Sequence, residues 1–180
     1  MIQRIQSIFL FIIAMLLLVT LTLSIWKNIG VYKKSNERVV IILDPIESLI
    51  QSLHGDGESL ADDKAGLAQP ANQSLTEKIS NFHIGALLLL TALNSLFIIF
   101  QYKKRMLQIK LSGLNYLLLS AILVSYYLAI KNNNDMLAEA GKGEFLIGFY
   151  VPIIAIILNF LVIKFIKKDE ALVRSVDRIR

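Results

Sequence analysis

The chain has 180 residues, of which 55% are hydrophobic and 18% are charged, and its net charge is +5. The hydrophobic share exceeds the ~45–50% of ordinary soluble domains and is concentrated in four blocks, which excludes a soluble globular domain. The same composition excludes an intrinsically disordered chain, and the absence of cysteine excludes a small domain held together by disulfides.

Four uncharged blocks are each long enough to cross a membrane once as a helix. A helix needs about 20 mainly apolar residues to span a hydrocarbon core about 30 Å thick, and lipid offers no partner to an unpaired backbone group. The first predicted span lies within the segment 1–26 and ends with it, and the others occupy 82–102, 111–130 and 145–163. Because the apolar run 5–26 is longer than the core of a secretory signal, we expect it to be retained as an anchor.

Lysine and arginine are distributed unequally between the two sides of these spans. The N-terminus, the loop 103–110 and the tail 164–180 carry eleven basic residues and three acids, whereas the loops 27–81 and 131–144 carry eight basic residues and eleven acids. The positive-inside rule then predicts that both termini are cytoplasmic and that the two acidic loops face outward. Because the basic residues flank spans and form no stripe, they indicate contact with anionic lipid and not with nucleic acid.

The first outer loop, 27–81, is predicted to contain a small α/β unit. Residues 29–34 and 38–43 are prone to form strands and are separated by three polar residues, which predicts a hairpin. The second run is continuously apolar, so we expect it either to be covered on both faces or to lie on the bilayer surface. Asp44 then has the features of a helix N-cap, and apolar residues at helical spacing predict a short amphipathic helix that ends near Leu53.

No charged residue lies in the core of any predicted span, which argues against an ion-coupled transporter, a proton pump or a redox subunit. Three amides are instead predicted in the cytoplasmic half of the membrane: Asn94, Asn115 and Asn159. One interpretation is that they form hydrogen bonds between helices, each contributing ~0.6–2 kcal/mol. The alternative is a polar pocket for a lipid headgroup or a small polar solute.

Motifs of enzymes and metal sites are weak in this chain. His54 and the acids that follow it (Asp56, Glu58, Asp62 and Asp63) match no known ligand spacing, so we interpret them as a solvated acidic loop. His83 is expected at the membrane interface, and the chain has no nucleophile elbow, phosphate loop or HExxH motif. We therefore predict no catalytic residue, metal or cofactor, and keep an enzyme acting at the outer face through these histidines as a third hypothesis.

Both basic cytoplasmic regions carry a candidate surface for a partner or for lipid. The tail is predicted to continue from the fourth span as an amphipathic helix, whose apolar face is suited to dock on the membrane surface, on the bundle or on another protein. The apolar face consists of Leu172, Val176 and Ile179, and the short loop contributes Lys103, Lys104 and Arg105.

The two ends of the chain carry a resemblance. The opening Met1-Ile2-Gln3-Arg4-Ile5-Gln6-Ser7 and the closing segment 168–180, which begins Lys168-Asp169-Glu170-Ala171, are similar to an uncharacterised family of small four-helix inner-membrane proteins of Gram-negative bacteria. That family is catalogued as a domain of unknown function. The resemblance implies a protein of the bacterial inner (cytoplasmic) membrane with both ends inside, and it implies no activity or cofactor. The layout also resembles that of claudins, but the paired cysteines of claudin loops are absent, so only the topology is shared.

Together these patterns predict an all-α integral membrane protein with four transmembrane helices, a small α/β outer-loop unit and an amphipathic C-terminal helix. The function they favour is a non-enzymatic accessory subunit or scaffold that binds a membrane-protein partner through the outer loop and the cytoplasmic tail. The alternative is a carrier or binder of a lipid or small polar solute that uses the three asparagines.

Overall fold

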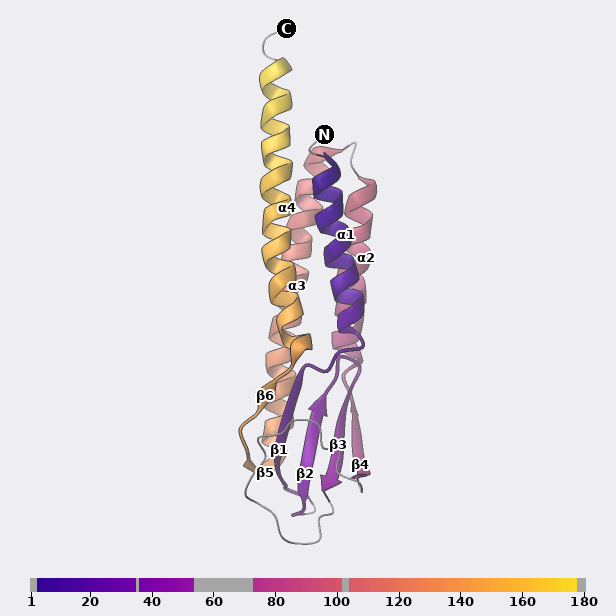
Figure 1. Ribbon diagram of the computed structural model, residues 1–180, viewed down its shortest axis with the longest axis vertical. Coiled ribbons are helices and arrows are strands. Elements are labelled where there is room, and N and C mark those ends of the chain that lie inside the picture. Colours follow the sequence, from indigo (N-terminus) through magenta and orange to yellow (C-terminus); the bar gives the residue numbers. More distant parts are fainter. Residues whose placement is uncertain (1–2, 35, 54–72, 102–103, 178–180) are drawn as a thin grey trace.

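The computed structural model describes residues 3–34, 36–53, 73–101 and 104–177. In these residues, four helices form a bundle, and a six-stranded antiparallel sheet lies at one end of it, so the molecule is elongated (Figure 1). The helices are α1 (Gln3–Thr20), α2 (Phe82–Phe100), α3 (Arg105–Asp135) and α4 (Ile147–Asp177). The strands are β1 (Trp26–Tyr32), β2 (Arg38–Leu43), β3 (Glu47–Leu53), β4 (Gln73–Ser80), β5 (Leu137–Ala140) and β6 (Glu144–Phe145).

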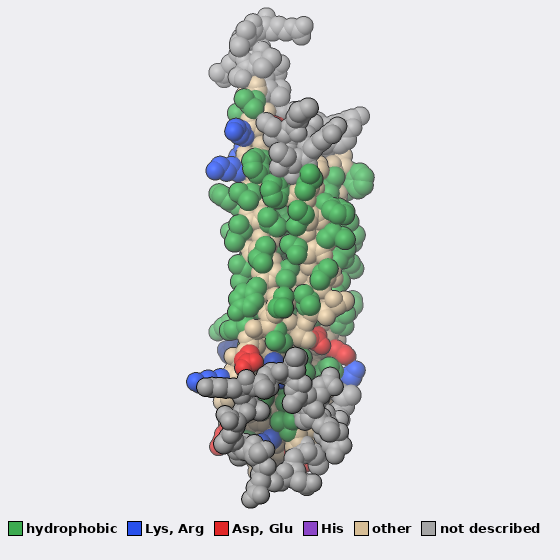
Figure 2. All heavy atoms as spheres, in the orientation of Figure 1, with side chains coloured by type: hydrophobic (Ala, Val, Ile, Leu, Met, Phe, Trp, Pro, Cys, Tyr) green, Lys and Arg blue, Asp and Glu red, His purple; other side chains and the backbone are tan. Residues whose placement is uncertain are grey.

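The four helices form a closed ring in which each helix packs against two others. Both α1 and α3 lie against α2 and α4, so the chain direction alternates around the bundle (Figure 1). The centre is filled by fully buried apolar side chains, among them Leu10, Leu17, Leu88, Leu119 and Val162. The outer surface is also apolar, and Figure 2 shows it as a belt around the middle of the molecule. Helices that are apolar all round are typical of membrane spans.

Three helices contain stretches that are long and apolar enough to cross a membrane: Phe82–Phe100, Met106–Asp135 and Ile147–Leu172. The first helix is shorter than predicted, because it ends at Thr20 and its apolar stretch covers Gln6–Thr20. Trp26, predicted as part of the first span, begins β1, and Ile25 immediately precedes it; both side chains are buried. Hydrophobicity does not distinguish a residue that faces lipid from one buried in protein, and this is why the predicted span was too long.

The sheet is organised around β1. The strand order is β4-β3-β2-β1-β5, and β6 also pairs with β1. The predicted hairpin is confirmed, since β1 and β2 pair antiparallel with Gly30 opposite Val39. The expected burial of β2 on both faces is confirmed as well, because the adjacent residues Val39 and Val40 are both buried.

The predicted short helix between Asp44 and Leu53 is wrong. These residues form a turn and β3, in which the buried residues Ser48, Ile50 and Ser52 alternate with more exposed neighbours. Apolar spacing over so short a run fits a helix or a strand, and an isolated helix of this length is marginal. Pairing with β3 satisfies the backbone groups on the second edge of β2. The described part of the outer unit is therefore a β-sheet and not an α/β unit. The four predicted helices are present, and the sheet stands beside them as a second element of the fold.

Most of the predicted second outer loop, 131–144, has regular structure. The helix α3 continues to Asp135, and β5 and β6 then pair with β1. These strands were not predicted, because segments as short as Leu137–Ala140 and Glu144–Phe145 cannot show the alternation of apolar and polar residues that indicates a strand. The predicted helical continuation of the fourth span into the tail is confirmed, since α4 runs unbroken to Asp177 and projects beyond the other helices (Figure 1).

Gly148 lies where α4 begins against the chain that leaves α1. A β-carbon at this position would lie 2.6 Å from the carbonyl oxygen of Ser24 and 2.9 Å from that of Leu23. We expect Gly148→Ala to lower the free energy of unfolding by ~1–3 kcal/mol, because two backbone segments must move apart. The thermal unfolding midpoint of the purified protein in detergent measures this effect.

Gly113 in α3 provides the matched control. A β-carbon there would meet no heavy atom within 4 Å. Gly113→Ala is expected to raise the free energy of unfolding by up to ~1 kcal/mol, since alanine favours the helix. A Gly148→Ala protein as stable as the Gly113→Ala protein would contradict the close backbone contact.

Candidate functional site

The three intramembrane asparagines predicted from the sequence come together in the bundle. Asn94 of α2 donates a hydrogen bond to Asn115 of α3 (Nδ2 to Oδ1, 3.2 Å), and Asn115 donates one to Asn159 of α4 (Nδ2 to Oδ1, 3.5 Å). Asn115 and Asn159 are fully buried, and Asn94 is partly exposed. A chain of amides thus links three helices at one level of the bundle, and we call these three residues the asparagine layer.

Each amide nitrogen of the asparagine layer also has an acceptor outside the layer. Asn115 Nδ2 donates to Ser95 Oγ at 3.0 Å, Asn159 Nδ2 to the carbonyl oxygen of Ser112 at 3.0 Å, and Asn94 Nδ2 to the carbonyl oxygen of Leu111 at 3.4 Å. Sequence reasoning missed the Ser95 hydroxyl and the Ser112 carbonyl, because a serine in a helix can bond the backbone of its own helix and so indicates no partner on another helix. The available signal was spacing, since Ser112 precedes Asn115 by one helical turn on the same face.

The asparagine layer offers neutral hydrogen-bonding groups and no side chain that titrates. Amides that bond across helices hold those helices at fixed relative heights, with ~0.6–2 kcal/mol for each bond. The hydroxyl of Ser112 is buried beside the layer and has no hydrogen-bond partner among the described residues. The layer is therefore suited to hold the bundle together, and this hydroxyl is a polar group that the described hydrogen bonds leave unused.

A second set of buried polar side chains joins the sheet to the bundle. Ser48 Oγ on β3 accepts hydrogen bonds from Asn81 Nδ2 at 2.6 Å and from Asn133 Nδ2 at 3.1 Å, and we call these three residues the junction. Beside it, Asn28 Nδ2 on β1 donates to Asn134 Oδ1 at 2.8 Å. The junction was not predicted, although three consecutive asparagines after the third span were a visible signal.

A third cluster, on the sheet, contains ionisable groups. The Tyr32 hydroxyl donates to Glu77 Oε2, and Lys34 Nζ lies 3.1 Å from the same oxygen. The hydrogen bonds from Tyr32 and Lys34 lower the pKa of the Glu77 carboxyl, whereas burial, followed by the bond to Glu77, raises the pKa of Tyr32. Because Tyr32 ends β1 and Glu77 lies on β4, the cluster ties two strands that are not neighbours in the sheet.

The predicted surface for a partner or lipid is described only in part. Lys104, just before α3, and Leu172, on α4, are both exposed. For Arg105 and Val176 the structure describes the helical backbone and not the side chain. Lys103 and Ile179 lie outside the described residues.

The structure brings no histidine into a described cluster of ligands. His83 is exposed in the first turn of α2, and His54 with its neighbouring acids lies outside the described residues. Across residues 3–34, 36–53, 73–101 and 104–177, no three His, Asp or Glu side chains lie close enough to hold a metal ion.

One family model covers nearly the whole chain. It is described as a domain of unknown function, DUF4293, and it matches residues 2–179. The chain belongs to this family. The resemblance to an uncharacterised family that we drew from the two ends of the sequence is therefore confirmed. No curated protein matches this DUF4293 chain.

Asn115→Leu tests whether the asparagine layer holds this DUF4293 chain together. The substitution keeps the side-chain size but removes the hydrogen bonds that Asn115 makes with Asn94, Ser95 and Asn159. We expect the free energy of unfolding to fall by ~1–3 kcal/mol. Unfolding midpoints in detergent measure the change.

Ser120→Ala is the control for this substitution, because Ser120 Oγ bonds only the Leu117 carbonyl of its own helix among the described contacts, at 2.7 Å. We expect it to change the free energy of unfolding by less than ~0.5 kcal/mol. Equal midpoints for Asn115→Leu and Ser120→Ala would show that the amides do not hold the helices.

The cluster of Tyr32, Lys34 and Glu77 predicts a pH dependence of stability. The folded state lowers the pKa of Glu77. The contribution of Glu77 to the free energy of unfolding is therefore complete above the ordinary carboxyl pKa, and it is lost as the pH falls through the pKa of the folded state. The pKa values of Tyr32 and Lys34 are raised, so their contributions are complete below the ordinary values of 10.0 and 10.5 and are lost as the pH rises through the raised values.

Unfolding midpoints of the wild type and of Glu77→Gln, measured from about pH 3 to pH 8, check the predicted loss of stability at acidic pH. The wild type is expected to be the more stable protein at neutral pH, and the difference is expected to narrow below about pH 4. A difference that does not change with pH would contradict a charged Glu77 in the cluster.

Proposed function

We propose that this protein is a non-enzymatic accessory subunit or scaffold of the bacterial inner membrane, which binds a membrane-protein partner through its sheet and the tail end of α4. The observation that carries the proposal is the continuity of α4. This helix begins just after β6 and runs for 31 residues, about 46 Å, to Asp177. A helix of this length is enough to cross a bilayer and to extend beyond it, and it connects both proposed partner surfaces.

The attachment of the sheet to the bundle also supports a scaffold. The junction joins β3 to the ends of α2 and α3 by buried hydrogen bonds. Near β6, the β-carbon position of Gly143 lies 2.5 Å from Nε1 of the buried Trp26, so the chain before α4 is packed tightly against β1. A sheet held at several points presents a fixed surface to a partner, which lowers the entropy cost of binding.

A fourth span, formed by α1, is part of the proposal. With 18 residues, α1 is about 27 Å long, close to the ~30 Å of the hydrocarbon core. It packs between α2 and α4 and exposes Phe11, Met15 and Val19 on the outside of the bundle. Large apolar side chains exposed on the same belt as those of the other helices support contact with lipid.

The charges at the two ends of the belt support cytoplasmic termini. Lys164, Lys167 and Lys168 are exposed where α4 leaves the belt, and Figure 2 shows basic side chains at this end. At the other end, around the sheet, acidic side chains lie among basic ones (Figure 2). By the positive-inside rule, this distribution supports an outward sheet and an inward tail.

The second candidate function is a carrier or binder of a lipid or small polar solute at the asparagine layer. The buried hydroxyl of Ser112, which has no described partner, favours it. The bonds of the three amides to one another favour the scaffold instead, because those amides are already occupied. Exchange of all three asparagines for leucine is expected to abolish a solute function, whereas it would change only the stability of a scaffold.

Single-cysteine variants test the scaffold in native membranes, and the chain has no cysteine of its own to replace. The positions are Ile29→Cys on the sheet and Leu172→Cys on α4, which are 48% and 49% exposed. The control is Leu117→Cys in the apolar belt, which is 65% exposed. Each variant is first labelled with a membrane-impermeant maleimide and then, in a separate sample, with a thiol-reactive photocrosslinker.

The expected result is that Ile29→Cys is labelled from outside the inner membrane, while Leu172→Cys is labelled only after that membrane is opened. The photocrosslinker is expected to join the same partner protein at one or both of these positions, and not at Leu117→Cys. The reverse labelling pattern would contradict the orientation. If the photocrosslinker joined the same proteins at all three positions, this result would contradict the scaffold function.

A further inference from the structure

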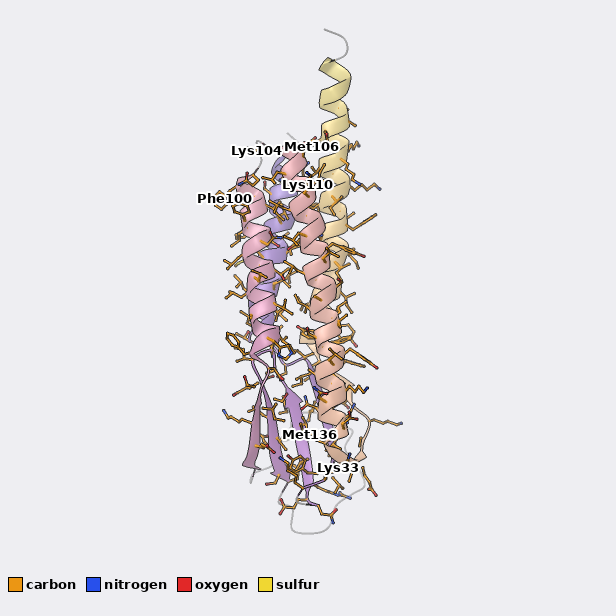
Figure 3. The ribbon with its side chains drawn as sticks, turned by 180° about the vertical axis from the view of Figure 1, so that it is seen from behind. Lys33, Phe100, Lys104, Met106, Lys110 and Met136 are labelled. Carbon is orange, nitrogen blue, oxygen red and sulfur yellow. The ribbon has the colours of Figure 1, made fainter. Side chains whose placement is uncertain are left out.

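A groove opens between the beginning of α3 and the tail half of α4, at the end of the apolar belt. Its volume is about 400 Å3, and its lining consists of Met106, Ile109, Lys167, Glu170 and Ala171. Met106 is 55% exposed, so an apolar side chain forms an open part of the lining. Figure 3 shows Met106 with Lys104 and Lys110 at this end of α3, beside α4.

The apolar side of the groove continues toward the belt. Gly113 follows Met106 and Ile109 at intervals of seven and four residues, so the three share one stripe of α3. A β-carbon at Gly113 would meet no heavy atom within 4 Å, which means that the space over the helix is open at this point. The next residue on the stripe, Leu117, is exposed in the belt. This stripe therefore offers a shallow apolar path that leads from the groove along the side of the bundle.

The groove itself is lined by one lysine, Lys167, and one acid, Glu170, and further lysines lie on neighbouring turns of both helices. The exposed lysines near it are Lys104 and Lys110 on α3 and Lys164, Lys167 and Lys168 on α4. Two acids, Asp169 and Glu170, lie on the same turns of α4, and the Asp169 carboxylate accepts a hydrogen bond from Gln6 Nε2 at 3.3 Å. Positive charge at the mouth of an apolar path is complementary to a molecule that carries both a phosphate and a hydrocarbon chain.

We propose that this groove binds one anionic glycerophospholipid, with its phosphate near Lys110 and Lys167 and an acyl chain along Met106, Ile109 and Gly113. The site rests on the membrane placement of the bundle in the proposed function, and not on the protein partner. Basic residues at a membrane surface attract anionic lipid diffusely, at ~1 kcal/mol each. The groove adds a position for a single molecule, because it combines the lysines with an apolar path.

Native mass spectrometry of the full-length protein in detergent tests this site with two lipids that have the same chains, phosphatidylglycerol and phosphatidylcholine. One phosphatidylglycerol is expected to bind in preference to phosphatidylcholine. The double variant Lys110→Gln/Lys167→Gln is expected to weaken phosphatidylglycerol binding about 25-fold, or about fivefold (~1 kcal/mol) for each lysine. Gly113→Leu places a side chain in the open space over Gly113 and is expected to weaken binding while all lysines are kept.

The matched control is Lys131→Gln/Lys142→Gln, which removes two exposed lysines at the sheet end of the molecule and is expected to leave lipid binding unchanged. Equal binding of the two lipids, or equal losses in the two double variants, would overturn the site. Displacement of the lipid by millimolar inorganic phosphate would assign the lysines to a free anion and would overturn it as well. No partner protein takes part in this test, so its failure leaves the crosslinking prediction intact. Likewise, failure to crosslink a partner leaves the lipid site intact.

Discussion

The Ser48 hydroxyl accepts hydrogen bonds from two asparagine amides, and the position of the sheet on the bundle depends on this contact. Asn81 immediately precedes α2 and Asn133 lies near the end of α3, so one small side chain joins a strand to two antiparallel helices. All three side chains are buried, and an amide that lost its acceptor there would cost ~1–3 kcal/mol. The contact also determines which face of β3 points inward, because Ile50 and Ser52 share the face of Ser48.

The junction and the asparagine layer hold the bundle at two heights, with apolar packing between them. Leucine side chains and lipid tails are equally apolar, so apolar contacts give helices in a bilayer little reason to prefer one relative height over another. Amides that bond across helices provide that preference. Because amides do not titrate, these two levels are independent of pH, in contrast to the cluster of Tyr32, Lys34 and Glu77.

The parts that could be predicted from the sequence were those with a strong local pattern. The apolar runs 82–102, 111–130 and 145–163 correspond to α2, α3 and α4, and the β-prone pair around residues 29–43 is a hairpin. Positions counted from the ends of the spans suggested a common level for Asn94, Asn115 and Asn159, and the structure brings their side chains within hydrogen-bonding distance. In each case, the pattern of apolar or charged residues that determines the structure lies within one short segment of the chain.

The remaining parts depend on contacts between distant segments. The run that ends at Leu53 has helical spacing, yet it is a strand because β2 offers it an open edge. Trp26 has the hydrophobicity of a span residue, yet it is buried under the chain around Gly143. Likewise, Ser95 and Ser112 accept hydrogen bonds from the asparagine layer only because α2, α3 and α4 meet there, which no single segment encodes.

The pairing of β1 has a consequence for the order in which the protein is assembled during synthesis. One edge of β1 pairs with the neighbouring β2, whereas the other pairs with β5 and β6, and the bonded residues Asn28 and Asn134 are 106 positions apart. The second edge therefore stays open until α2 and α3 have been made, and an open strand edge invites pairing with other chains. Contacts this distant in sequence also form slowly. The nascent chain thus passes through an interval in which its hairpin is exposed, and a chain that stops before Leu137 would remain in that state.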